Sequence, residues 1–441
     1  MELVDRILEK CTRSGAEMAE VFVKSQKTLS IVVRDGKVES ITKASPDGLA
    51  IRYFSFGKTA FAHATDLSDM AVDKLIFQLS KIVKKTGEDQ YAALPGPQTY
   101  VNNLDLYDLS RVENSTDSKI EYLVGLEKQA LQFDPTVTKS NGVTYEETVT
   151  TISLANSNGV NVGYQTTLYE IRISVSAEKK GEMFPGEGSF SVRHFGDLPA
   201  PEEMVRRVVS KAARLVAGGA VDAGDYEIIF TPDAGWSLLW GLSAALDGDS
   251  FLKNSSFLAG KENTGMAGQS FSLYDDATMP RGIASRPADD EGTASRKVAL
   301  IENGVFMQPL YDMKTAARAG ATSTGSSARN SYDSVPGISP SNFFIAPGKD
   351  KVDDVVASCR QGIIVEATQG WGLHSVTGQY SAGINGVLVR NGKRIMPVAN
   401  VTIAATADEL FNGISAICDD ITFYYRFNTP TILVKRMKVG A

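Results

Sequence analysis

The segment AEVFVKSQKTLSIVVRDGKVESITKASPDGLAIRYFSFGKTAFAHA, residues 19–64, alternates apolar and polar residues along most of its length. Turn residues interrupt the alternation at Asp35-Gly36 and again at Pro46-Asp47-Gly48. A period of two that is broken by such turns predicts consecutive antiparallel strands. We therefore expect a meander of four or five strands in this part of the chain.

Segments with helical spacing lie on both sides of this meander. The first twenty residues predict an amphipathic helix, and a second helix is expected from about residue 68 to residue 85. The pattern then recurs, with a helix near 120–132, strands broken at Asn141-Gly142 and Asn158-Gly159, and a helix at about 202–217. This order predicts one N-terminal α+β domain, residues 1–220, built as an internal pseudo-repeat of helix and meander.

The character of the chain changes from Asp225 onward. The run YEIIF predicts a strand, Asp233 is a plausible N-cap, and a helix is expected to continue to about Leu246. Short apolar runs then alternate with stretches rich in Gly, Ser and Asn, and the segment 315–341 predicts a long mobile or functional loop. We expect an α+β protein whose C-terminal domain, residues 221–441, is a β-rich barrel or sandwich.

Composition excludes several classes of function. The chain has 441 residues, 43% of them hydrophobic and 22% charged, which is typical of a globular protein. Its formal net charge is −7, and it has no long block of Lys and Arg, so we do not expect nucleic-acid binding. No apolar run reaches the roughly 18 residues that a membrane span needs, and the N-terminus lacks the apolar core of a signal peptide. The expected location is the cytoplasm.

Cysteine and histidine are scarce. The three cysteines, Cys11, Cys359 and Cys418, lie far apart in the sequence and form no metal-binding or redox pair. The chain has only three histidines. A zinc hydrolase that works alone would usually need two or three histidines close together, so this chain is a poor candidate for one.

The second half of the chain carries a series of short motifs. In order along the chain they are Arg286-Pro287, Asp289-Asp290-Glu291-Gly292, Ile301-Glu302-Asn303-Gly304, Ser323-Thr324-Gly325, Val376-Thr377-Gly378, Gly383, Gly386, Asn391-Gly392 and Pro397-Val398. These motifs, in this order, closely resemble the TldD/PmbA family, whose PmbA members are also called TldE. A weaker N-terminal pattern extends the resemblance to nearly the whole chain.

The resemblance implies a metalloprotease of two subunits, in which the TldD-type subunit carries a zinc-binding His-Glu-x-x-x-His helix and the PmbA-type subunit lacks it. The segment GWSLLWGLSAALDGDSF, residues 235–251, corresponds to that helix. Aligning its acidic turn places the two histidines at Leu239 and Ala244 and the glutamate at Trp240. Leu and Ala have no lone pair for Zn²⁺, and an indole cannot act as the general base. We expect no catalytic residue and no metal or cofactor in this chain, and a helix that is buried on nearly all sides.

The same resemblance implies that this chain is a non-catalytic subunit. It would pair with a TldD-type partner that holds Zn²⁺, and the pair would degrade or process peptides and unfolded proteins. The other expected assembly is a homodimer. The family is linked to peptide-antibiotic maturation, to antitoxin turnover and to the label "modulator of DNA gyrase". An extended peptide could add a strand to an exposed sheet edge. The loops 315–341 and 370–386 are the expected lining of the cleft, and the candidate contact residues are Asp289, Asp290, Glu291, His374, Ser375, Thr377 and Gly378.

Two other functions remain open. The chain could be a homodimeric peptide-binding module without protease activity, or an independent hydrolase that uses Cys418 or a serine of STGSSARNS with His374 as base. Cys418 also lies near the place where TldD-type sequences carry a cysteine associated with the metal. The other acidic pairs, among them Asp275-Asp276 and Asp419-Asp420, are expected to cap helices and form turns.

Overall fold

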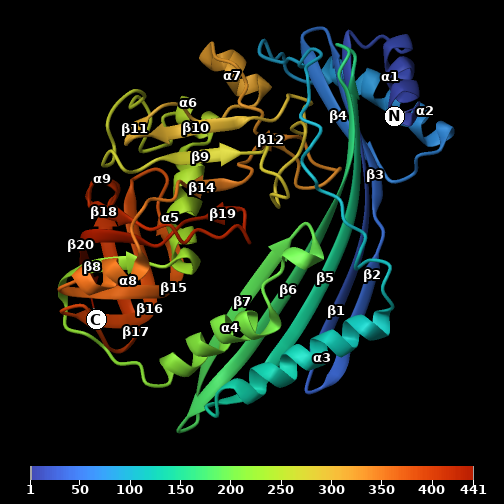
Figure 1. The fold of residues 1–441 in the computed structure, drawn as a ribbon. Helices are drawn as coiled ribbons and strands as arrows, with labels where there is room; N and C mark the ends of the chain where they lie inside the picture. Colours follow the sequence, from blue (N-terminus) through green and yellow to red (C-terminus); the bar gives the residue numbers. More distant parts are fainter. Residues whose placement is uncertain (1, 441) are drawn as a thin grey trace.

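The computed structural model describes residues 2–440 and has a mixed α+β fold. Figure 1 shows a long twisted sheet, coloured blue to green, beside a β-rich part coloured yellow to red. Helices α3 and α4 lie at one end of the long sheet, and α1 and α2 lie at the other. Within residues 2–440, no helix is both long enough and apolar enough to cross a membrane.

The N-terminal half contains the predicted helices and four strands within residues 19–64. The hairpin turn expected at Pro46-Asp47-Gly48 is not formed, because strands 37–44 and 47–55 pair with successive parts of the first strand and not with each other. The elements of this half are α1 (Glu2–Arg13), β1 (Met18–Arg34), β2 (Lys37–Ala44), β3 (Asp47–Ser55), β4 (Lys58–Ala64), α2 (Asp69–Ile82), the 3-10 turn Val83–Lys85, α3 (Thr116–Phe133), β5 (Val137–Asn156), β6 (Asn161–Lys179), β7 (Glu182–Val192), the 3-10 turn Phe195–Asp197 and α4 (Pro201–Leu215).

These seven strands form one sheet in the order β4-β3-β1-β5-β6-β7, and β2 also pairs with β1. The predicted strand break at Asn141-Gly142 is wrong, because both residues lie inside β5. The register with β6 shifts there, between Ser140 and Gly142, as at a β-bulge. Gly142 has φ of 121°, a conformation that glycine adopts without strain, so the bulge explains the glycine.

The C-terminal half contains a barrel and a smaller sheet. The barrel is closed because β17 pairs with both β16 and β20, which confirms the barrel-like prediction. Its strands are β8 (Gly224–Phe230), β15 (Gln361–Leu373), β16 (Gln379–Arg390), β17 (Lys393–Thr406) and β20 (Ile432–Gly440), with β18 (Ile414–Ile417) beside β20. The smaller sheet has the order β11 (Val305–Phe306), β10 (Lys297–Glu302), β9 (Leu273–Asp276), β14 (Phe343–Ile345), β19 (Phe427–Asn428).

Short helices and one hairpin complete this half. They are α5 (Pro232–Ala245), α6 (Gly248–Leu252), α7 (Met313–Ala319), α8 (Val352–Ser358), α9 (Ala407–Asn412) and the hairpin β12 (Ser327–Ala328) and β13 (Gly337–Ile338). The segment 315–341 is therefore not one long loop, since it contains most of α7 and the hairpin. Asp233 is not the N-cap of α5, because Thr231 occupies that position and Asp233 lies in the first turn.

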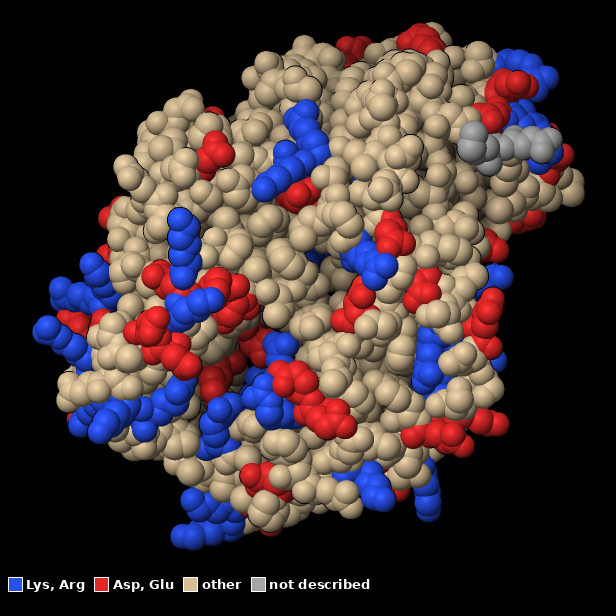
Figure 2. Space-filling view, viewed as in Figure 1, with Lys and Arg blue, Asp and Glu red and all other residues tan. Residues whose placement is uncertain are grey.

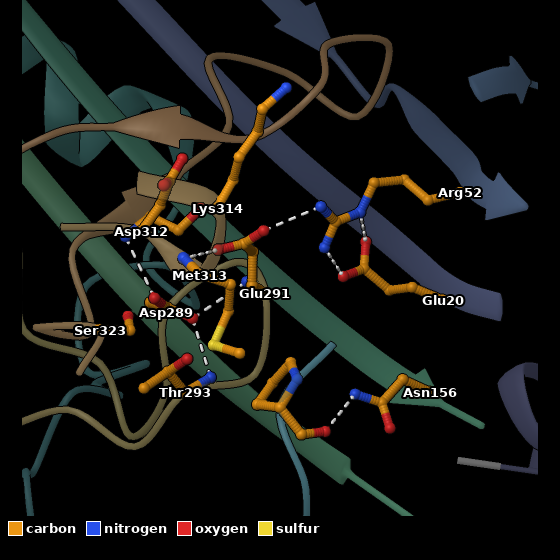
Figure 3. A network of polar contacts seen from close by, with 12 residues as sticks. Glu20, Arg52, Asn156, Asp289, Glu291, Thr293, Asp312, Met313, Lys314 and Ser323 are labelled. Carbon is orange, nitrogen blue, oxygen red and sulfur yellow. Dashed lines mark hydrogen bonds and ion pairs between the residues drawn. The ribbon is translucent and has the colours of Figure 1, made fainter. Parts of the chain in front are cut away.

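Buried ion pairs connect the long sheet to the C-terminal half (Figure 3). Arg52 of β3 donates from Nη1 to Glu291 Oε1 at 2.8 Å and from Nε to Glu20 Oε1 of β1 at 3.0 Å. Arg329 also pairs with Glu20, and the side chains of Glu20, Glu291 and Arg329 are at most 3% exposed. Burial alone would lower the pKa of Arg52, but Glu20 and Glu291 outweigh it and raise the pKa. Each charge in this network depends on a partner from a distant part of the sequence.

Replacing Arg52 with methionine should destabilise the protein strongly, because it leaves the carboxylates of Glu20 and Glu291 short of a buried partner. We expect Arg52→Met to lower the free energy of unfolding by about 3–5 kcal/mol. Arg206→Met is the control, since Arg206 pairs with Glu203 on the surface of α4 and its side chain is 59% exposed. That change should cost about 1 kcal/mol or less. Denaturant unfolding measures both, and equal losses would contradict the role assigned to Arg52.

Candidate functional site

A cavity of about 500 Å³ lies between the long sheet and the barrel, and we refer to it as the cleft. It is lined by residues 185–189 of β7, by Lys211 and Leu215 of α4, by Asp233 and Trp236 of α5, and by residues 366–369 of β15. Figure 2 shows that Lys, Arg, Asp and Glu crowd the surface around α4 and the barrel, whereas the upper surface in that view carries few charges.

Two strand edges without a neighbouring strand border the cleft. β7 ends the order of its sheet, and among the strands of residues 2–440 it pairs with β6 alone. β15 pairs with β8 only over residues 362–365, and the next four residues line the cleft. In each strand consecutive residues border the cavity, so its wall is a backbone edge and not one face of the sheet. Such edges can accept an extended peptide through main-chain hydrogen bonds.

Ion pairs between α4 and the barrel hold the walls of the cleft together. Lys211 Nζ lies 2.6 Å from Asp233 Oδ2, and Arg207 Nη2 lies 2.9 Å from Asp233 Oδ1. Arg214 reaches Glu366 of β15 at 3.1 Å. Burial alone would raise the pKa of Asp233, but Lys211 and Arg207 outweigh burial and lower it. Asp233 therefore remains an anion that joins the two halves of the protein.

Helix α5 is not buried on nearly all sides, as the sequence led us to expect. Trp236 and Trp240 are 39% and 50% exposed, and Ala244 is also exposed. These three residues are four apart, so they lie on one side of the helix, and we call them the α5 stripe. Leu239 points into the core and is fully buried. The helix kept an apolar sequence, but one side of it faces solvent.

The positions aligned with a zinc motif are therefore divided between two environments. Leu239 packs in the main core, while Trp240 and Ala244 lie on the α5 stripe. Cys418 is fully buried in a separate cluster with Cys359 and Leu433, and burial raises the pKa of its thiol to about 12. Across residues 2–440, no three His, Cys, Asp or Glu side chains are arranged to hold a metal ion.

The acidic turn does not line an open cleft. Asp289, Asp290 and Glu291 are 2%, 7% and 3% exposed. Asp289 accepts hydrogen bonds from the backbone N–H of Glu291, Thr293 and Ser327, and Asp290 accepts one from Arg329. Burial raises the pKa of Asp289 and of Glu291. In this structure the three carboxyl groups connect segments of the fold, and none of them lines the cleft.

His374, Ser375, Thr377 and Gly378 form the exposed turn between β15 and β16. His374 Nδ1 accepts from the backbone N–H of Val376 and of Thr377, both at 3.3 Å, and the Ser375 carbonyl accepts from the N–H of Phe257. Gly378 has φ of 69°, a left-handed conformation that favours glycine. The imidazole therefore stabilises its own turn, and the structure places these residues apart from the buried acidic turn.

The edge of β7 and the exposure of Trp236 were not predicted from the sequence. Two signals were present. Gly186 and Gly188 alternate in β7, and a Cβ on either residue would lie within 2.7 Å of atoms of Val208, so these glycines allow α4 to pack closely against the strand. The spacing of four between Trp236, Trp240 and Ala244 also marked one side of α5.

The predicted turn role of Asp275-Asp276 holds for one residue of the pair. Asp276 Oδ1 accepts from the N–H and the hydroxyl of Thr278 in a turn. Asp275 is buried in β9, where burial raises its pKa to about 6 although the N–H of Ser341 donates to its Oδ1 at 2.6 Å. Its ionisation therefore opposes folding at neutral pH.

Comparison with known proteins identifies the same family along most of the chain. Models of the PmbA/TldA metallopeptidase match domain 1 at residues 19–83, the central domain at 112–216 and the C-terminal domain at 223–441. An uncharacterized protein of Methanocaldococcus jannaschii is 29% identical over 98% of both chains. Metalloprotease PmbA of Escherichia coli O157:H7 is 26% identical, covering 100% of this chain and 97% of its own. The crystal structure of TldE from Thermococcus kodakarensis matches with a TM-score of 0.91, 22% identity and full coverage of both chains.

Leu239→His should destabilise the protein far more than Ala244→His. The first change places an imidazole in a fully buried position and removes apolar packing, which should lower the free energy of unfolding by about 2–5 kcal/mol. The second lies on the exposed α5 stripe and should cost less than about 1 kcal/mol. Urea unfolding of the two variants tests this, and similar losses would show that the helix is oriented differently.

Asp275→Asn should stabilise the protein as the pH rises. The folded-state pKa of about 6 lies above the usual 3.8, so the stability of the wild type is highest below the usual value and falls as the pH rises through about 6. Asparagine stays neutral at every pH. The free energy of unfolding of Asp275→Asn should therefore exceed that of the wild type by near zero at pH 4 and by roughly 2–3 kcal/mol at pH 8. Unfolding at both pH values measures it, with Asp353→Asn, whose side chain is 94% exposed, as control. A difference that does not vary with pH would contradict the buried carboxyl.

Proposed function

Because this chain belongs to the PmbA/TldD family of metallopeptidases, we propose that it is the PmbA/TldE-type, non-catalytic subunit of a cytoplasmic peptidase. A TldD-type partner supplies the zinc site, and the pair acts on peptides and unfolded proteins. Peptide-antibiotic maturation and antitoxin turnover are the processes in which such a pair would work.

The composition and placement of α5 carry the non-catalytic part of this proposal. Leu239, Trp240 and Ala244 offer neither a metal ligand nor a general base. The only aligned position inside the core is occupied by leucine. A thiol with a pKa of about 12 is a poor ligand and a poor nucleophile near neutral pH, so Cys418 does not replace the missing groups.

The cleft supports the peptide part. An enzyme for unfolded chains must recognise features that all peptides share, and backbone N–H and C=O groups are such features. Two strand edges bordering one cavity offer partners for them without demanding a particular sequence. The same observation supports the second candidate, a homodimeric peptide-binding module without a protease partner.

An independent hydrolase has less support. Its candidate base, His374, uses Nδ1 within its own turn. Of the candidate serines of STGSSARNS, Ser323, Ser326 and Ser327 are at most 4% exposed, and Ser331 is half-buried. A substrate would have to enter the core to meet the first three.

Mixing the purified chain with a TldD-type subunit from the same genome tests the proposed function. We expect the two chains to co-elute in size-exclusion chromatography and the mixture to cleave unfolded casein, while this chain alone is inactive and a chelator stops the mixture. Replacing the glutamate of the partner's His-Glu-x-x-x-His helix, the expected general base, should abolish cleavage and preserve co-elution.

Two results would reject the proposal. Absence of co-elution together with unchanged partner activity would favour the peptide-binding module. Cleavage by this chain alone in the presence of chelator, lost in Cys418→Ala, would favour the independent hydrolase.

A further inference from the structure

Trp240 of the α5 stripe is the exposed end of a row of three aromatic rings that contact one another in sequence. The Phe343 and Phe427 ring centroids are 5.7 Å apart at an interplanar angle of 78°, and Phe427 and Trp240 are 5.7 Å apart at 76°. Both contacts have the edge-to-face geometry that aromatic pairs favour. Phe343 is buried, whereas half of Trp240 is exposed. One more ring could therefore pack on Trp240 in the same way.

Helix α5 follows the course of β15. A Cβ on Gly372 would lie 2.4 Å from the carbonyl oxygen of Ser237, and a Cβ on Gly241 would lie 1.8 Å from that of Leu373. At the other end, the N–H of Thr231 donates to the carbonyl of Val365. Helix and strand therefore advance in the same direction, and the unpaired edge at 366–369 comes before the contacts at 372 and 373.

The spacing of the two tryptophans matches that of an extended peptide. Residues four apart in a helix are separated by about 6 Å along its axis. Side chains on one face of a strand repeat every two residues, or about 6.6–6.8 Å. Trp236 lines the cleft, and Trp240 follows one helical turn later on the same side. Alternate side chains of one bound strand could thus lie on the two indole rings.

We propose that the α5 stripe is a side-chain subsite that selects extended peptides carrying an aromatic residue, with Trp240 and Trp236 as its contact surface and the edges of β7 and β15 binding the peptide backbone. The proposal rests on the peptide-binding part of the proposed function and adds a substrate class to it. At the aligned position where a catalytic subunit needs a carboxylate, this chain presents an indole that binds and does not react.

An extended peptide fits this surface better than a folded partner. The cleft encloses about 500 Å³, enough for a few residues of chain, and its free hydrogen-bonding groups belong to strand edges. A second copy of this chain could also pair through the edge of β7. The experiment must therefore distinguish a bound peptide from a second copy as the occupant of this edge.

The test uses acetylated, amidated peptides of sequence Ser-Thr-Thr-X-Thr-Thr-Ser, with X as Phe, Leu or Ala, titrated into the isolated full chain by calorimetry. We expect the Phe peptide to bind about tenfold more tightly than the Ala peptide. In Trp240→Ala this preference should fall below about threefold, and Trp240→Phe should restore most of it. Methylation of alternate backbone nitrogens should abolish binding, because strand addition needs the peptide N–H groups.

Phe77→Ala is the matched control, since Phe77 is a 61% exposed aromatic residue on α2, and it should leave the preference unchanged. Equal affinity for the Phe, Leu and Ala peptides, or a preference that survives Trp240→Ala, overturns the subsite. Light scattering during the titration measures the molar mass of the protein. If the peptide binds only while a dimer dissociates, the occupant of the edge in the free protein is a second copy. Co-elution with the TldD-type partner is measured separately, so the subsite can fail while the subunit role stands.

Discussion

The relative placement of the two halves depends on a small set of buried charges. Glu20, Arg52, Glu291 and Arg329 come from four distant parts of the sequence and meet between the long sheet and the acidic turn. A buried charge is costly unless a partner with good geometry compensates for it, so alternative arrangements of the two halves would leave several charges unpaired. The pairs from α4 to Asp233 and Glu366 act in the same way beside the cleft. The cleft exists because these pairs fix both of its walls.

The position of α5 follows from this arrangement. Its buried side, with Leu238, Leu239 and Leu242, belongs to the core of the barrel half, and its first turn is tied to α4 through Asp233. The opposite side presents Trp236 to the cleft and leaves Trp240 and Ala244 exposed, and these last two are among the three positions aligned with the zinc motif. In this chain that side presents indole rings, which suit binding and cannot perform hydrolysis.

Local pattern was sufficient to predict much of the fold. The strands within 19–64, the long helices and the barrel-like C-terminal half could be predicted because strand and helix periods are properties of short segments. The pairing of strands 37–44 and 47–55 with one and the same strand could not, since it depends on tertiary contacts. The bulge in β5 was mistaken for a turn, since Asn-Gly serves both and only the pairing with β6 distinguishes them. The family motifs identified α5 as the informative helix.

The candidate site was less predictable because its parts are distant in sequence. Hydrophobicity alone placed Trp240 in the core, yet an indole also suits an exposed surface beside other rings. Acidic residues in a Gly-containing turn looked accessible, but Glu291 pairs with Arg52, more than two hundred positions away, and Asp290 accepts from the backbone N–H of Arg329 in another loop. The edges of β7 and β15 meet only through the tertiary fold.

We propose that this chain holds no metal of its own. Elemental analysis of the purified full chain, isolated without chelator from cells grown with zinc, tests this most directly. We predict far less than one zinc ion per chain, with no change in Cys418→Ser. One tightly held zinc per chain that is lost in Cys418→Ser would contradict it.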